Sequence, residues 1–61
     1  MNITIKPLDN GTYRVTPDHP VFDVHTYGTI YAAIDAAKVL VKRHPDKFDT
    51  IVVSEVPVYV G

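Results

Sequence analysis

Two aspartate–histidine pairs are the best candidates for a reactive or metal-binding site in this chain. Asp23 and His25 lie two residues apart, so on a strand they would share a face, and Asp18 and His19 lie just before them. Imidazole and carboxylate groups can hold a metal ion. Such pairs also serve solubility and capping at turns and strand ends, and we expect neither a metal site nor a cofactor.

Catalytic motifs are missing from the 61 residues. The chain has no cysteine, which excludes disulfides, thiolate nucleophiles and thiolate zinc sites. It has no glycine-rich phosphate loop, and Ser54 lies in an apolar stretch without a nucleophile elbow. We therefore expect a protein that is not an enzyme.

Two surfaces could bind a macromolecule. The first is a protein-binding surface of tyrosines on a helix flank, with Lys38 beside them, and apolar residues of the last strand: Tyr27, Tyr31, Lys38, Val58 and Tyr59. Its apolar strand edge could also pair with a second copy of the chain, giving a homodimer. The simpler interpretation is that the tyrosines only cover the rim of a small core and that the last strand is more deeply buried.

The second surface is a pair of cations, Lys6 and Arg14, on the outer face of the predicted sheet. They could contact phosphates, and binding would then fall steeply with added salt. Since the net charge is −1, no global field attracts nucleic acid. Nucleic-acid binding is therefore kept as the alternative to protein binding.

The helix that positions the first surface is predicted over residues 26–44. At about 100° per residue, one stripe is apolar and suited to a core: Ile30, Ala33, Ile34, Ala37, Leu40 and Val41. Thr26 is the expected N-cap, and Pro45 prevents continuation beyond His44. This places Tyr27 and Tyr31 four residues apart on the helix.

The first two strands are predicted to form a hairpin with Ile3 and Ile5 inward. A two-residue turn at Asn10-Gly11 would mix apolar and polar residues on each face. A three-residue loop with Gly11 left-handed instead sets Ile5 opposite Val15. We choose the second geometry, which also sets Pro7 opposite Tyr13.

A four-residue turn at residues 17–20 is expected to add a third antiparallel strand. It would set Val15 opposite Phe22 and Tyr13 opposite Val24, all facing inward. His25 and Asp23 would lie on the outer face, where Asp23 would form an ion pair with Arg14.

After the helix, Phe48 is expected to pack under the helix end. Thr50 to Val60 then form a last strand beside the first, with a bulge near Glu55 or Pro57. Residues 1–61 thus form a single α+β domain: a small, mainly antiparallel sheet with one helix on one face, in the order β-β-β-α-β.

This order resembles that of the small podovirus inhibitors of host bacterial RNA polymerase. Most of the similarity lies in Val21-Phe22-Asp23-Val24, followed by Ala32-Ala33-Ile34-Asp35-Ala36-Ala37, and it extends over about three quarters of the chain. Those inhibitors grip the polymerase with arginines of the last strand, where this chain has Glu55 and no arginine. The resemblance implies the fold, and no functional residue is carried over.

Together these observations predict a small non-enzymatic protein-interaction module, a phage-type accessory protein that binds and modulates a larger host protein. No apolar run is long enough to span a bilayer, and the first residues alternate instead of forming a signal peptide. We expect a cytoplasmic protein with no membrane partner, in the host cytoplasm if the protein is viral.

Overall fold

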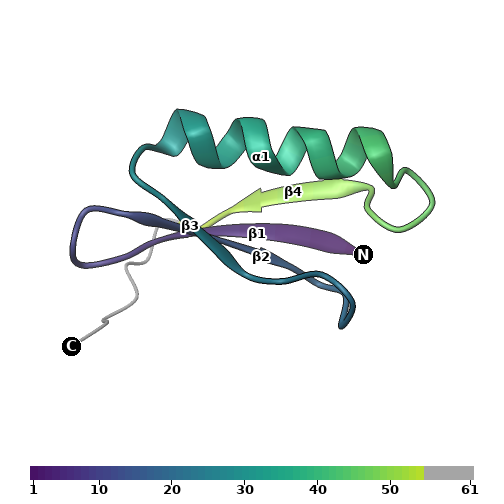
Figure 1. The fold of residues 1–61 in the computed structure, drawn as a ribbon, viewed down its shortest axis with the longest axis horizontal. Coiled ribbons are helices and arrows are strands. Elements are labelled where there is room, and N and C mark those ends of the chain that lie inside the picture. The colour runs from purple at the N-terminus through teal and green to yellow at the C-terminus, as the bar shows by residue number, and fades with distance from the viewer. Residues whose placement is uncertain (55–61) are drawn as a thin grey trace.

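The computed structural model describes residues 1–54 and shows one helix packed on one face of a four-stranded sheet (Figure 1). The elements follow the predicted order: β1 (Asn2–Pro7), β2 (Tyr13–Pro17), β3 (His25–Tyr27), α1 (Ile30–Arg43) and β4 (Thr50–Val53). In space the strands run β3-β2-β1-β4. β1 is antiparallel to β2 and parallel to β4, so the sheet is mixed and the fold is α+β.

The β1–β2 hairpin has the predicted register. Ile5 lies opposite Val15 and Pro7 opposite Tyr13, and Gly11 has a φ of 85°, in the left-handed region that the three-residue loop requires. The loop is closed by the backbone N–H of Leu8, which donates to the carbonyl of Thr12 at 2.8 Å. The side-chain pattern was sufficient here because directly opposed residues must share a face.

The register predicted for the third strand is wrong by three residues. Val15 lies opposite His25 and Tyr13 opposite Tyr27, in place of Phe22 and Val24. Residues 18–24 form a longer loop instead of a tight turn, and Val24 is half exposed. In this loop the Val21 N–H donates to His19 Nδ1 and the Phe22 N–H donates to the His19 carbonyl, each at 3.2 Å.

The shifted register changes two further predictions. His25 shares a face with Val15 on the helix side of the sheet, and is not on the outer face as expected. Arg14 lies opposite Thr26, and the predicted ion pair between Arg14 and Asp23 is not formed. The ion pairs found among residues 1–54 join the N-terminus to Asp49 and Lys47 to Asp46.

The N-cap of α1 lies three residues later than predicted. Its N-cap is Thr29, whose hydroxyl accepts a hydrogen bond from the Ala32 N–H at 3.1 Å. Thr26 cannot cap the helix because it lies in β3. At the other end the His44 N–H donates to the Leu40 carbonyl at 2.9 Å, just before Pro45, as the sequence predicted.

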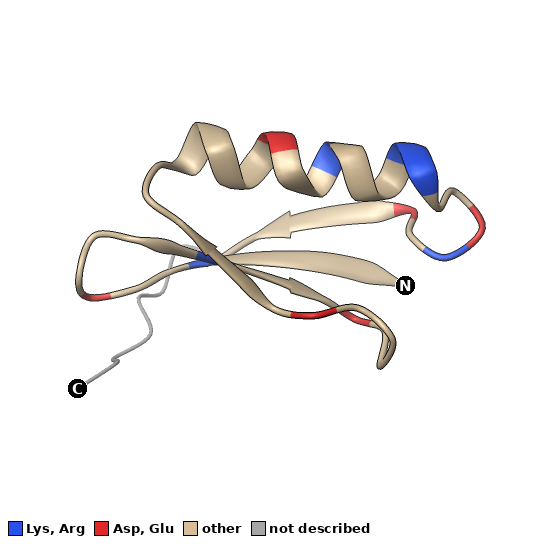
Figure 2. Cartoon of the chain, in the orientation of Figure 1, with Lys and Arg blue, Asp and Glu red and all other residues tan. Residues whose placement is uncertain are grey.

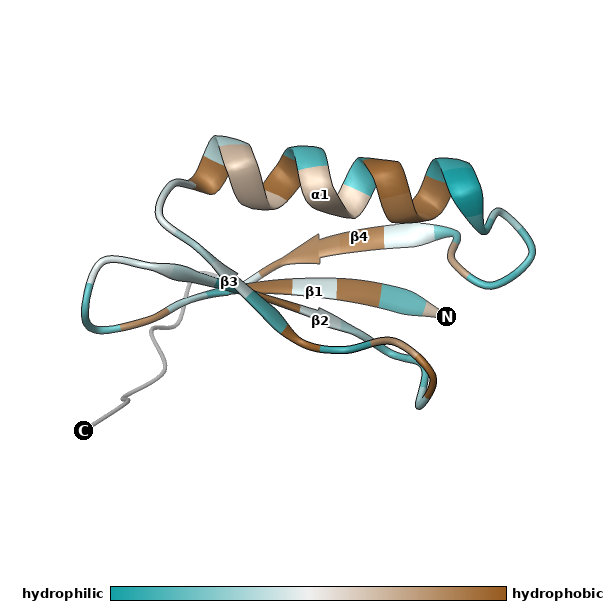
Figure 3. Ribbon diagram, viewed as in Figure 1, coloured by the Kyte–Doolittle hydropathy of each residue, from teal (hydrophilic) through white to brown (hydrophobic). Residues whose placement is uncertain are grey.

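The core lies between α1 and the sheet, and hydrophobic residues recur along both the helix and the strands (Figure 3). Ala33 and Ala37 of α1 are fully buried, so the helix approaches the sheet closely over small side chains. They meet the inward residues of the sheet and of the segment after the helix: Ile3, Ile5, Val15 and Phe48. Phe48, at 1% exposure, occupies the place predicted for it under the helix end.

β4 lies beside β1, as predicted, with Ile51 opposite Ile3. Its described part ends at Val53, and the predicted continuation to Val60, with a bulge near Glu55 or Pro57, lies outside the described residues. β3 and β4 are therefore the two edges of the sheet described here.

Candidate protein-binding groove

An apolar groove of about 260 Å³ lies between α1 and the edge strand β3. We call it the β3 groove. Five apolar residues and three polar residues line it: Val15, Pro17, Ala36, Val39, Leu40, Asp23, His25 and Tyr27. The apolar residues come from β2 and α1, and the polar residues from β3 and the residues just before it. The groove therefore has apolar walls and a polar rim on one side.

The polar rim follows from the alternation of side chains along an extended chain. His25 and Tyr27 are two residues apart in β3 and lie on the helix side of the sheet, opposite Val15 and Tyr13. Asp23 lies two residues before His25 and also lines the groove. One edge of β3 pairs with β2, and its other edge is free of pairing with any described strand. Polar side chains and a free backbone edge thus lie along the groove.

The helix contributes a flank of small and apolar residues to the same region. Ala36, Val39 and Leu40 line the groove, and by helical geometry Ala32 lies on the solvent side of the same flank. Val39 is 45% exposed and Ala32 is also exposed. A strand added beside β3 would therefore find apolar helix surface above it.

Of the five predicted protein-binding residues, the three that the structure describes do not form one patch. Tyr27 belongs to β3, so the predicted helical spacing of Tyr27 and Tyr31 is wrong; it failed because the helix begins only at Ile30. Tyr31 is 77% exposed and Lys38 is exposed. Being seven residues apart, they share a flank of α1, which helical geometry places opposite the groove flank. Tyr27 alone of these three lines the groove.

The remaining two predicted residues, Val58 and Tyr59, lie outside the described residues. The groove itself was not predicted. Its sequence signal is the two-residue spacing of Asp23, His25 and Tyr27, which places all three on one face of an extended chain. The helix predicted from Thr26 onward cut this pattern off after His25.

Lys6 and Arg14 are directly opposed on β1 and β2, on the sheet face away from α1. Three threonines share this face: Thr4, Thr16 and Thr26. Like charges directly opposite each other are unfavourable in a sheet, and neither cation has an ion-pair partner among residues 1–54. Most lysine and arginine instead gathers towards the C-terminal end of α1 and the following loop (Figure 2).

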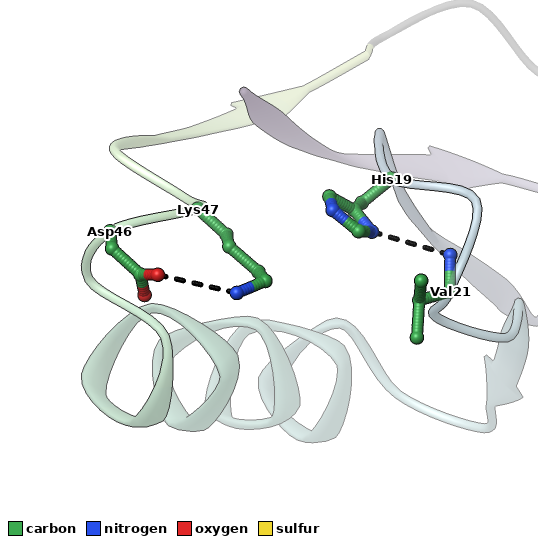
Figure 4. A network of polar contacts seen from close by, with 4 residues as sticks. All are labelled: His19, Val21, Asp46 and Lys47. Carbon is green, nitrogen blue, oxygen red and sulfur yellow. Dashed lines mark hydrogen bonds and ion pairs between the residues drawn. The ribbon is translucent and has the colours of Figure 1, made fainter.

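Two of the three histidines pack against aromatic rings, while His25 lines the β3 groove. His19 and His44 pack edge-on against Phe22, with ring centroids 5.3 and 4.7 Å apart, and Phe22 packs in turn against Phe48 at 5.1 Å. Figure 4 shows His19 with its contact to Val21. Within the described residues, no three histidine, aspartate or glutamate side chains gather in a way that could hold a metal ion.

Asp46 lies beside Lys47 in the segment after α1 and forms a hydrogen bond with it. The Lys47 ammonium donates to its carboxylate at 3.2 Å (Figure 4), and this hydrogen bond lowers the pKa of Asp46 below 3.8. Both side chains are solvent-accessible and lie in the turn after α1. The contact is therefore an exposed ion pair between neighbouring residues.

No protein-family model matches the chain, and neither a curated protein nor a solved structure matches it. In the part that the structure describes, no helix is long and apolar enough to cross a membrane.

Proposed function

We propose that the protein is a non-enzymatic protein-interaction module that binds an extended segment of a larger protein in the β3 groove. The observation that carries the proposal is the apolar groove beside a free strand edge. A partner segment could pair its backbone with β3 and place alternate side chains against the helix flank. Backbone pairing would supply affinity, and the groove would supply selectivity.

The dimensions of the groove favour a peptide side chain over a cofactor. Small-molecule sites usually measure about 300–1,000 Å³, whereas this groove measures about 260 Å³ and is only partly enclosed. A single large side chain fits that space. The described polar residues around it have no arrangement typical of a nucleophile with its base.

We further propose that the partner is a host protein and that binding modulates it, as for a phage-type accessory protein acting in the host cytoplasm. The support is the order of elements, which resembles that of the podovirus polymerase inhibitors. A partner that fills the groove and crosses the solvent side of α1 past Asp35 would also reach Tyr31 and Lys38. We therefore keep these two residues as a secondary contact.

Affinity capture from a host lysate tests the proposal, using the wild-type chain and two matched variants. Val39→Asp places a charge in the groove, and Tyr31→Asp places the same charge on the opposite flank at a more exposed position. We expect one protein to be retained by the wild type after nuclease treatment and at high salt, lost with Val39→Asp and reduced with Tyr31→Asp. Equal capture by all three proteins would contradict binding in the groove.

The second candidate function is nucleic-acid binding by Lys6 and Arg14. Their direct opposition on the sheet face away from α1 favours it, because a phosphate between them would relieve their repulsion. Two phosphate contacts would give a slope of about −1.8 in log affinity against log salt. Binding of a random DNA duplex that is lost in Lys6→Gln/Arg14→Gln, but kept in the exposed-end control Lys42→Gln/Arg43→Gln, would establish this function.

A further inference from the structure

The β3 groove combines apolar walls with one formal charge. Of its eight lining residues, Asp23 alone is charged when histidine is neutral. Asp23 is exposed, and no ion pair or side-chain hydrogen bond to it is formed within residues 1–54. The carboxylate is therefore free to accept a hydrogen bond from a ligand, and its negative charge disfavours an acidic ligand.

We propose that the groove takes a lysine or arginine side chain from the partner's extended segment, with the aliphatic stem between the walls and the cationic end on Asp23. This inference rests on the proposed function and adds the type of partner side chain that the groove selects. Long cationic side chains bury their methylene groups along apolar surface while the charge stays in water. The groove offers both environments, because Val39 and Leu40 form its wall and Asp23 lies at its exposed rim.

The geometry of strand addition delivers such a side chain to the groove. On a strand paired with β3, every second residue lies on the helix side of the sheet, as His25 and Tyr27 do. One of these residues would enter between β3 and the flank formed by Ala36 and Val39. A purely aliphatic residue would fill the walls and leave the carboxylate unpaired, and a glutamate would be repelled by it.

The test uses three synthetic peptides, Ac-Thr-Val-Thr-Xaa-Thr-Val-Thr-amide, in which Xaa is lysine, norleucine or glutamate. Norleucine keeps the lysine stem without its charge. Each peptide is titrated into the 15N-labelled full chain at low salt, and affinity is read from the amide shifts of His25, Thr26 and Tyr27. We expect the lysine peptide to bind roughly threefold to fivefold tighter than the norleucine peptide, as for an exposed ion pair, and the glutamate peptide to bind most weakly.

Two variants complete the test. Asp23→Asn removes the charge from the rim, and Asp18→Asn removes an exposed aspartate that does not line the groove. The lysine advantage should disappear in the first variant and persist in the second, with dispersed spectra showing that both are folded.

The peptide titrations distinguish a failure of cation selection by Asp23 from a failure of binding beside β3. If the lysine and norleucine peptides shift the β3 amides with equal affinity, the assignment of a cation to Asp23 is overturned, while binding beside β3 stands. If all three peptides leave these amides unshifted, strand addition at β3 is overturned together with the specificity.

Discussion

Single residues decide where this chain turns, and the turn at Gly11 could be predicted from the sequence. Three-residue hairpin loops need a left-handed residue, and the face pattern of the flanking strands left one register with consistent sides. Gly11 has that backbone conformation, with a φ of 85°. Asn10 supports the same loop, because its side-chain oxygen accepts the Thr12 N–H at 3.1 Å.

Replacing Gly11 by alanine should destabilise the protein by about 1–2 kcal/mol, the usual penalty of a left-handed conformation for a residue with a Cβ. No atom lies within 4 Å of the added Cβ, so the loss would come from the backbone alone. Gly28→Ala is the matched control, since that position is equally open and its φ is not positive. Urea denaturation should show a loss for the first variant and no loss for the second; equal stabilities would contradict the loop geometry.

Asp46 gives a pH dependence at the same scale. Because hydrogen bonding to Lys47 lowers its pKa in the folded protein, the carboxylate contributes stability above its unfolded pKa, near 3.8. That contribution is lost as the pH falls through the lower folded value. In Lys47→Met the carboxyl group should titrate closer to 3.8, as followed by 13C chemical shifts of Asp46. An unchanged titration would show that Lys47 is not the cause.

Among the elements, the helix was predicted correctly except for its start. The apolar stripe correctly placed Ala33 and Ala37 in the core, because helical periodicity persists over the whole segment. The predicted N-cap was Thr26, whereas the structure has Thr29 there, and residue type alone does not distinguish these two threonines. Pairing of residues 25–27 with β2 decided between them, and that contact is invisible in the local sequence.

Thr29→Ala should therefore cost about 1 kcal/mol, since it removes the acceptor for the Ala32 N–H. Thr26→Ala should cost less, because Thr26 is exposed on a three-residue edge strand and caps nothing. Thermal unfolding monitored by circular dichroism would rank the stabilities of the two variants. A larger loss for Thr26→Ala would contradict the helix boundary.

The contact between helix and sheet depends on small residues. Ala37→Leu would push a large side chain into a fully buried position and should destabilise the protein by about 1–3 kcal/mol. Ala32→Leu, on the exposed side of the same helix, should be nearly neutral. Chemical denaturation of both variants would measure the difference, and tolerance of leucine at both positions would show that α1 does not pack as closely as described.

The loop before β3 explains why the third strand was misplaced. Phe22 is apolar, as the inward residues of a strand are, and the sequence pattern therefore wrongly predicted it in the third strand. Its ring instead packs against His19 of the same loop and against His44 and Phe48 of the segment after α1. Such long-range contacts leave no periodic signal, and the β3 groove, which depends on the position of β3, could not be predicted either.

At the scale of the whole molecule, one helix covers one face of a four-stranded sheet within residues 1–54. A chain of 61 residues buries only about 60% of its unfolded surface, so its margin of stability is small. One face carries Lys6 and Arg14, one strand edge adjoins the apolar groove, and the opposite helix flank carries Tyr31 and Lys38. The fold predicted from the sequence holds, as does the position of Lys6 and Arg14 on the outer sheet face, whereas the β3 groove is visible only in the structure.

Binding of a protein partner in the β3 groove, as we propose, can be tested by site-specific photo-crosslinking. The photoreactive residue p-benzoylphenylalanine would replace Val39 in the groove, Tyr31 on the opposite flank or Lys6 on the sheet face away from α1, in the full chain exposed to host lysate. We expect one crosslinked host protein from position 39, a weaker adduct of the same protein from position 31 and none from position 6. Crosslinks from position 6 alone, or adducts that are nucleic acid or a second copy of the chain, would contradict this proposal.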